Sequence, residues 1–177
     1  MKELNFYSNK LTSFLLLIIS SILVTGGIFV SEKILNFEDK TFKTTFLIFG
    51  FLLFVLGIIL SLLLLFRRKP LLTITDNQII IHNVIAKSKI VEIDNINSFF
   101  IVNNYHRGIA TNRQIFIELK KPDTKYSNTW LYNLIFKISK PIANSQYSIQ
   151  TDFLNIKQKE LLEILNKLIK RRIITKL

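Results

Sequence analysis

Two long runs of apolar residues dominate the first half of the chain. One extends from Leu11 to Val30 and the other from Thr44 to Phe66, and neither contains a charged residue. As a helix the first run would be about 30 Å long, which matches the hydrocarbon thickness of a bilayer. The second is longer and can span with some tilt. Because neither run shows the polar stripe of a buried core helix, we predict two transmembrane helices, over 11–30 and 44–66.

Small residues recur at matching depths in these two predicted spans. In an antiparallel hairpin, residues at equal depth have a constant sum of sequence numbers, which pairs Gly27 with Gly50 and Ser20 with Gly57. Small side chains let two helix backbones approach closely in lipid. We therefore expect these four residues to form the contact of a packed helical hairpin. The alternative is chance, because Gly is frequent in transmembrane helices generally.

A different pattern, with short alternations of apolar and polar residues, begins after Pro70. Period-2 alternation is typical of half-buried strands. The segments that show it are 71–75, 79–83, 89–94, 98–103, 114–120 and 147–153. Asp76 and Asn77 form a predicted turn between the first two strands. The pattern predicts a small antiparallel sheet, sandwich or barrel.

Two amphipathic segments in the same region predict helices, over 128–140 and about 156–172. Asn155 is the predicted N-cap of the second, with Gln158 as its reciprocal partner. The sequence thus predicts an α+β protein with two parts. Residues 1–69 would form an N-terminal tail and two transmembrane helices, and residues 70–177 a small antiparallel β domain capped by a C-terminal helix.

Charge is unevenly distributed along the chain. There are 24 Lys and Arg against 12 Asp and Glu, and 19 of the basic but only 8 of the acidic residues lie from Arg67 onward. Arg67, Arg68 and Lys69 directly follow the second apolar run. Because Lys and Arg near the helix ends mark the cytoplasmic side, both termini are predicted in the cytoplasm and the connecting loop outside.

Residue types suited to catalysis or metal binding are scarce. The chain has no cysteine, and His82 and His106 are not at metal-ligand spacing. Glu92 and Asp94 are expected on one side of a strand, but two acids on a solvated strand face are far commoner than a catalytic pair. No Gly-rich phosphate loop or nucleophile elbow is present. We therefore predict no catalytic, cofactor-binding or metal-binding residue, no cofactor, and a protein that is not an enzyme.

The helix predicted over 128–140 has two open interpretations. Trp130 and Tyr132 favour the headgroup level of a bilayer, and Lys137 and Lys140 its polar side, so the helix could lie in the membrane interface. An apolar stripe more often covers a sheet. On the first interpretation the membrane-surface contact comprises Arg67, Arg68, Lys69, Trp130, Tyr132, Lys137 and Lys140.

Three segments carry a resemblance to known proteins: the opening MKELNFYSNKL, the segment FRRKPLLTITDNQIII and the ending KPIANSQYSIQTDFLNIKQKELLEIL. The chain resembles PH-like domains of bacterial membrane proteins, and more closely an uncharacterised bacterial family of small two-helix inner-membrane proteins. The resemblance implies a split-sheet barrel closed by the C-terminal helix, on the cytoplasmic side of a bacterial inner membrane. It implies no activity and no binding residue.

Two classes of function agree with these features. One is a membrane-anchored, non-catalytic interaction or scaffold module with an unknown protein partner. The other is a module that binds or senses anionic lipid headgroups at the bilayer surface. An immunity-type protein is a weaker third idea that no residue specifies. Binding of nucleic acid is disfavoured, because basic charge alone is not specific to nucleic-acid-binding proteins and no nucleic-acid-binding motif accompanies it.

Overall fold

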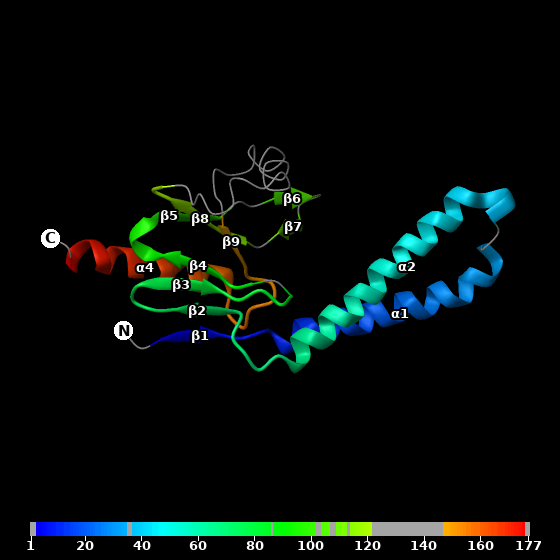
Figure 1. Cartoon of the computed structure of the whole chain (residues 1–177), viewed down its shortest axis with the longest axis horizontal. Helices are drawn as coiled ribbons and strands as arrows, with labels where there is room; N and C mark the ends of the chain where they lie inside the picture. The colour runs from blue at the N-terminus through cyan, green and yellow to red at the C-terminus, as the bar shows by residue number, and fades with distance from the viewer. Residues whose placement is uncertain are drawn as a thin grey trace. The chain divides into compact units, whose positions relative to one another are not determined.

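The computed structural model describes residues 3–34, 37–85, 87–101, 104–106, 109–112, 114–121 and 147–175. The chain forms two compact units. One consists of Ser8–Lys69, and the other combines Met1–Tyr7 with Pro70–Leu177. The helical unit is therefore inserted, along the chain, between two pieces of the second unit (Figure 1).

Two long helices make up the helical unit, α1 (Lys10–Ile34) and α2 (Phe37–Phe66). Both extend beyond the uncharged runs into charged sequence. Asn9 caps α1, because its side-chain Oδ1 accepts the N–H groups of Leu11 at 3.1 Å and Thr12 at 3.3 Å. Both helices are long and apolar enough to cross a membrane, and 11% of the most apolar window of each is buried. Their apolar side chains therefore remain largely exposed, unlike those of a core helix.

The first strand, β1 (Leu4–Phe6), precedes both helices and was not predicted. It pairs antiparallel with β2 (Leu72–Ile74), and Phe6 lies opposite Leu72. The N-terminal segment, expected to be a tail of the membrane part, thus belongs to the unit that follows Pro70. A three-residue strand is too short for an alternating pattern to be recognised in the sequence.

Four strands form the first sheet, in the order β1-β2-β3-β4. The added strands are β3 (Gln78–Ile81) and β4 (Lys89–Glu92). The predicted turn at Asp76 and Asn77 joins β2 to β3, and the Thr75 hydroxyl braces it by donating to the carbonyl of Gln78 at 3.0 Å.

A one-turn 3-10 helix, η1 (Ile93–Asn95), leads from the first sheet to the second. The second sheet has the order β5-β8-β9, and β6 and β7 pair separately. These strands are β5 (Ile96–Ile101), β6 (Asn104–His106), β7 (Ile109–Asn112), β8 (Gln114–Leu119) and β9 (Tyr147–Gln150). Each of the six predicted strands thus corresponds to an observed one. The third ends at Glu92 instead of Asp94, because the chain turns into η1.

The C-terminal helix α4 (Gln158–Thr175) contacts β5 and β8. Its apolar stripe includes Leu161 and Leu165, which are both fully buried. Buried side chains from both sheets complete the core, among them Ile74, Ile79, Ile115, Ile117 and Ile149. Their burial removes large apolar areas from water, which is the main stabilising term of such a domain.

The start of α4 differs from the predicted capping arrangement. The helix begins at Gln158, and Asn155 is used elsewhere. The Asn155 side chain accepts the N–H of Tyr7 at 3.1 Å, and its backbone N–H donates to the Tyr7 carbonyl at 3.0 Å. The Gln158 side chain donates to the carbonyl of Gln114 at 3.1 Å. The side chains of Asn155 and Gln158 therefore bind backbone groups of segments that lie far from them in sequence. The sequence alone does not show that these segments are neighbours.

Candidate membrane-anchor and interface sites

The contact between α1 and α2 is lined by small and hydroxyl side chains. Ser13, Ser20, Thr44 and Ser61 are buried although they lie on apolar helices. Ser13 and Ser61 satisfy their hydroxyl groups within their own helices, by donating to the carbonyls of Asn9 at 2.9 Å and Gly57 at 2.7 Å. These residues can therefore face the other helix without leaving a buried donor unpaired.

Ser20 and Gly57 come together at this contact. A Cβ atom on Gly57 would lie 2.6 Å from the Ser20 Oγ, which is closer than real Cβ atoms approach. A side chain at position 57 would therefore displace the Ser20 hydroxyl, whereas the Ser20 Cβ, at 3.5 Å, is at an ordinary contact distance. This is the geometry by which small residues allow tight packing in lipid.

Gly27 and Gly50 lie in a different environment. A Cβ on Gly27 would lie 3.7 Å from the Phe51 ring, and one on Gly50 would meet nothing within 4 Å. Both residues line an apolar groove of about 390 Å³. Its other lining residues are Leu23, Lys43, Phe46, Leu47, Phe51 and Phe54. The close contact is therefore found at Ser20 and Gly57, whereas the other predicted pair borders a groove.

Lys10 connects the beginning of α1 to the end of α2. Its ammonium group donates to the carbonyls of Leu64 at 2.9 Å, Leu65 at 2.7 Å and Arg67 at 2.9 Å. The Ser8 hydroxyl also donates to the carbonyl of Leu64, at 2.9 Å. The last carbonyls of a helix have no partner within it and carry partial negative charge, which a lysine neutralises. This contact has no signal in the sequence, because it depends on tertiary structure.

The basic residues after α2 extend from this helix end. Arg68 and Lys69 are exposed, and Arg67 is partly buried, with its Nε donating to the Lys69 carbonyl at 3.2 Å. The other predicted membrane-surface residues, Trp130, Tyr132, Lys137 and Lys140, lie outside the described residues, as does the helix predicted over 128–140.

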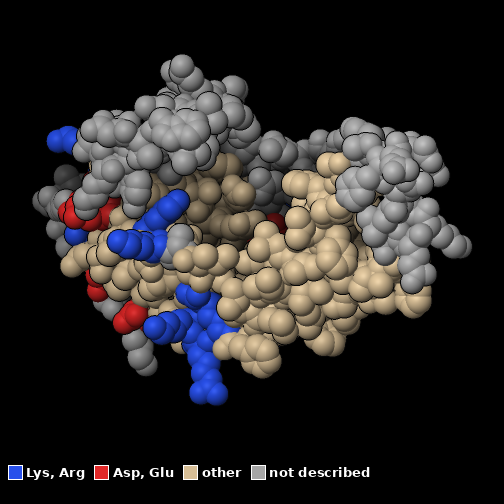
Figure 2. Space-filling view, turned by 45° about the vertical axis from the view of Figure 1, so that its right-hand side comes forward, with Lys and Arg blue, Asp and Glu red and all other residues tan. Residues whose placement is uncertain are grey.

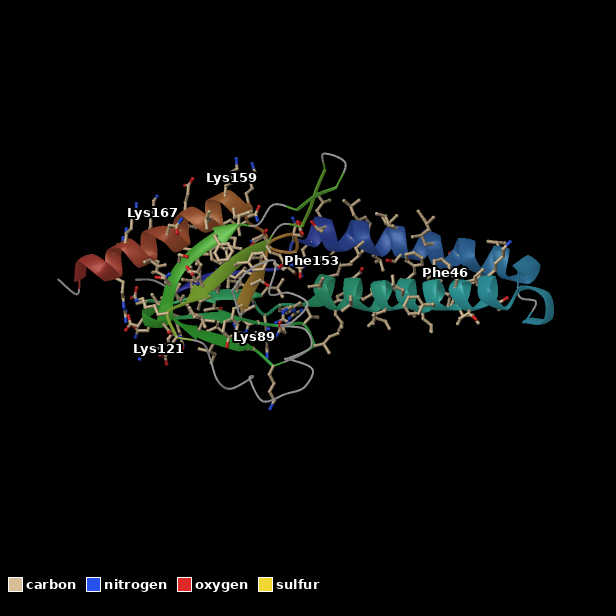
Figure 3. All side chains as sticks on the ribbon, turned by 90° about the horizontal axis from the view of Figure 1, so that it is seen from above. Phe46, Lys89, Lys121, Phe153, Lys159 and Lys167 are labelled. Carbon is tan, nitrogen blue, oxygen red and sulfur yellow. The ribbon has the colours of Figure 1, made fainter. Side chains whose placement is uncertain are left out.

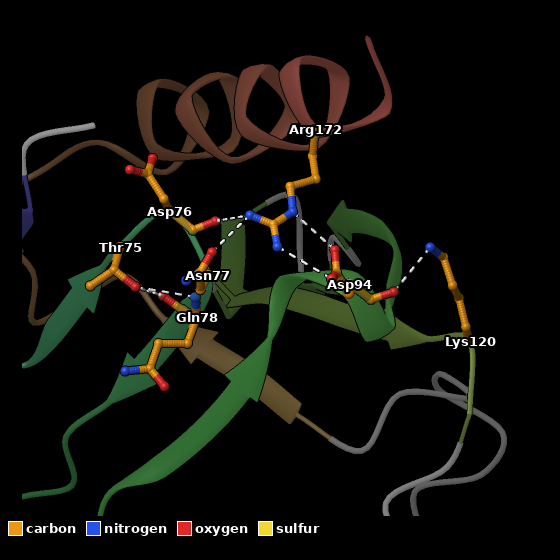
Figure 4. A network of polar contacts seen from close by, with 7 residues as sticks. All are labelled: Thr75, Asp76, Asn77, Gln78, Asp94, Lys120 and Arg172. Carbon is orange, nitrogen blue, oxygen red and sulfur yellow. Dashed lines mark hydrogen bonds and ion pairs between the residues drawn. The ribbon is translucent and has the colours of Figure 1, made fainter. Parts of the chain in front are cut away.

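Arg172 on α4 joins the helix to the first sheet (Figure 4). Its guanidinium binds the Asp94 carboxylate through two bonds, of 2.9 and 3.2 Å, and donates to the Asp76 carbonyl at 2.8 Å and the Asn77 side chain at 2.9 Å. The hydrogen bond to Asp94 raises the pKa of Arg172 above its ordinary value. Asp94 is therefore a structural partner, and Glu92 and Asp94 do not form a pair on one strand.

A chain of polar contacts crosses the first sheet. The Thr73 hydroxyl donates to the Asn5 Oδ1 at 2.7 Å and lies 3.2 Å from the His82 Nε2. Since the Thr73 hydrogen goes to Asn5, the Nε2 of His82 is the donor in that contact. The His82 Nδ1 lies 3.0 Å from the Ser88 Oγ. His82 thus links β2 to the connection between β3 and β4. His106 lies in β6, at the pairing with Ile109.

Glu118 on β8 has two hydrogen-bond donors. The Ser98 hydroxyl lies 2.6 Å and the Asn97 amide 2.9 Å from its Oε2. These bonds, that of Ser98 above all, lower the pKa of Glu118 below its ordinary value, against the opposing effect of desolvation. The carboxylate is thus held ionised between neighbouring strands.

Basic side chains dominate the charged surface seen in Figure 2, where uncharged surface adjoins them. Lys159 and Lys167 extend from α4 away from the sheets (Figure 3). Among the described residues, no group of three or more His, Asp or Glu side chains is placed to hold a metal ion.

Comparison with known proteins identified no relative. No protein-family model matches the chain, and no curated protein or solved structure is significantly similar to it.

Proposed function

We propose that this chain is a membrane-anchored, non-catalytic interaction or scaffold module. In this proposal α1 and α2 cross a bacterial cytoplasmic membrane as a hairpin, and the basic α+β unit lies at the cytoplasmic face, where it binds a protein partner. The observation that carries the proposal is the pairing of β1 with β2.

This pairing constrains how the helices can cross. β1 precedes α1 and β2 follows α2, yet the two strands exchange backbone hydrogen bonds along three residue pairs. A strand cannot pair through a bilayer, so both chain ends of the helix pair must emerge on one side. Two spans satisfy this condition, whereas a single span does not.

Charge supports the cytoplasmic assignment. Lys10 lies at the beginning of α1, and Arg67, Arg68 and Lys69 follow the end of α2. Lys and Arg next to spanning helices are retained on the cytoplasmic side. The lysine and the three following basic residues therefore favour a cytoplasmic location of both helix ends.

The architecture of the second unit supports the resemblance to PH-like domains. Two antiparallel sheets and a C-terminal helix share one core, as a split barrel closed by a helix would require. Such a unit offers a protein partner the edge of a sheet. β4 lies at one end of the strand order in the first sheet, as far as the described residues extend.

The proposal is tested on the full-length protein in its native membrane. Alkaline carbonate should leave the protein in the membrane fraction, and release into the supernatant would contradict the anchor. Purification in a mild detergent after brief cross-linking should then yield a stoichiometric protein partner. Recovery of lipid alone would instead favour the alternative function, binding of anionic headgroups.

A further inference from the structure

One end of the first sheet is the end from which the chain leads to both helices. Phe6 lies opposite Leu72, Leu72 opposite Ile81 and Ile81 opposite Lys89. In this row Phe6 is the last residue of β1 before the chain continues into α1. Leu72 is the first residue of β2 after the chain returns from α2. The connection from β3 to β4 begins and ends at the same row.

Backbone hydrogen bonds confirm this placement. The N–H of Leu71 donates to the Phe6 carbonyl at 2.8 Å, and the N–H of His82 donates to the Leu71 carbonyl at 2.8 Å. The β3–β4 connection therefore starts directly beside both chain segments that lead to the helices.

The chain segments between this row and the helices are short. Phe6 and Lys10 are four positions apart, and Phe66 and Leu72 are six positions apart. Fully extended, the longer of these segments spans at most about 20 Å. If the helices cross a bilayer, as proposed above, this end of the sheet cannot leave the vicinity of the membrane surface.

Exposed large hydrophobic side chains lie just beyond this end row or, for Ile90, in the row next to it. Among the described residues of the second unit, the exposed large hydrophobic side chains are Tyr7, Ile85 and Ile90, at 42, 74 and 57% exposure. Tyr7 follows Phe6, Ile85 lies in the β3–β4 connection and Ile90 follows Lys89. Burying an isoleucine that is this exposed removes a large apolar area from water.

Hydrogen bonds join the two described arms of the β3–β4 connection. The Asn83 side chain donates to the Lys87 carbonyl at 2.7 Å, and the His82 ring contacts the Ser88 hydroxyl at 3.0 Å. Both contacts join the two arms of the connection, and Ile85 lies between them in sequence. Because these contacts already join the described arms, the arms lose less conformational entropy when the connection binds a surface.

The charge of this connection is positive. Lys87 and Lys89 are exposed, and the sequence from Ile79 to Val91 contains no acidic residue. The opposite end of the sheet carries Asp76 and Asp94, bound by Arg172. A lysine close to an exposed apolar side chain is suited to a bilayer surface with anionic lipids, because the apolar group enters the interface and the ammonium group binds a headgroup.

We propose that the β3–β4 connection docks on the membrane that anchors the chain. Ile85 inserts into the headgroup region, and Lys87 contacts anionic lipid headgroups, whereas the Lys89 ammonium lies over the Tyr147 ring, 5.8 Å from its centroid. This inference rests on the proposed function, since it needs the helices to hold the sheet near the bilayer. It assigns the alternative, lipid-binding role to a defined loop.

The absence of cysteine makes site-specific labelling straightforward. The full-length protein carrying Ile85→Cys, labelled with an environment-sensitive fluorophore, is reconstituted in bilayers of equal parts phosphatidylcholine and phosphatidylglycerol. The label should shift its emission to the blue and be quenched by spin-labelled lipid. The matched control is Lys121→Cys, an exposed position at the opposite end of the sheets (Figure 3), which should stay unquenched.

A second control separates this inference from the proposed function. Phe49→Cys lies on the exposed apolar surface of α2 and should be quenched if the helix is in the bilayer. Quenching at position 49 without quenching at 85 would overturn the docking loop and leave the anchor intact. Lack of quenching at both positions would overturn the anchor itself.

The lysines are tested in the same reconstituted protein labelled at position 85. Lys87→Gln should lower the ratio of docked to undocked loop about fivefold, as loss of one lysine at an anionic surface does. Lys167→Gln, on the exposed face of α4, should leave quenching unchanged. Equal effects of the two substitutions, or docking that is unaffected by omitting phosphatidylglycerol, would contradict the headgroup contacts.

Discussion

Ser20 on α1 and Gly57 on α2 are in direct contact, and the Ser20 Oγ lies only 2.6 Å from where a Cβ atom of residue 57 would be. This approach brings the helix backbones together without a large side chain between them. Because lipid tails are as apolar as leucine, close packing of this kind is what associates helices in a membrane.

Replacing Gly57 by leucine should separate the helices. The added side chain collides with Ser20, and overpacking of a close contact typically costs about 1–3 kcal/mol. The expected result is a lower unfolding temperature of the full-length protein in detergent. The matched control is Gly50→Leu, where a Cβ meets nothing within 4 Å, and which should be tolerated. Equal stability of the two variants would argue against the helix contact.

Lys10→Met should destabilise the junction between the start of α1 and the end of α2. It removes the donor to the carbonyls of Leu64 and Leu65 in the last turn of α2 and of Arg67 just after it, and also the charge that offsets the helix dipole, a loss of about 1 kcal/mol. Thermal unfolding in detergent measures the effect. Arg68→Gln removes an exposed cation at the same helix end and should have a smaller effect. A larger loss in the Arg68 variant would refute the cap.

Arg172→Met should loosen the end of α4 from the turn between β2 and β3. Amide hydrogen exchange should accelerate at Asp76 and Asn77, which lose their contacts with the guanidinium. Arg172→Lys should restore protection only in part, because an ammonium group lacks the planar fork that binds Asp94 at two oxygens. Exchange at the turn should be unchanged in the control Lys170→Gln, a neighbouring exposed cation.

Glu118 should make stability depend on pH in the acidic range. Its folded pKa is lowered, so the ionised carboxylate stabilises the fold above the ordinary glutamate pKa of about 4.3. This contribution is lost as the pH falls through the lower folded pKa. The difference in unfolding temperature between the native protein and Glu118→Gln should therefore shrink on acidification from neutral pH. Glu163→Gln, on α4, is the control. If the difference in unfolding temperature between the native protein and Glu118→Gln grew at low pH, this role of Glu118 would be contradicted.

Much of the fold could be predicted from local patterns. The two apolar helices and the six alternating strands each have enough residues for a period to be recognised. Strand ends were less predictable, because Asp94 continues the alternation of β4 but lies in η1. At Asp94 the chain has already turned out of the strand, and the Asp94 side chain binds Arg172. The alternating pattern of the sequence does not reveal this turn.

The parts that escaped prediction depend on contacts between distant segments. β1 has three residues and is recognisable only through its partner β2. Asn155 resembles a helix cap in sequence, but its side chain binds the backbone of Tyr7. The pairing of residues at equal depth in an antiparallel hairpin predicts that Ser20 and Gly57 meet. The three carbonyl contacts of Lys10 follow from no such rule, because they depend on where the two helix ends lie in space.

We propose that β1 and β2, the strands before and after the helix pair, lie together on the cytoplasmic side. Single cysteines at Glu3, Asp39 and Lys121 of the full-length, otherwise cysteine-free protein can be exposed in intact cells to a membrane-impermeant thiol reagent. We predict labelling at position 39 alone, with positions 3 and 121 reacting only after the membrane is permeabilised. Labelling of position 121 from outside, or different sides for positions 3 and 121, would contradict the claim.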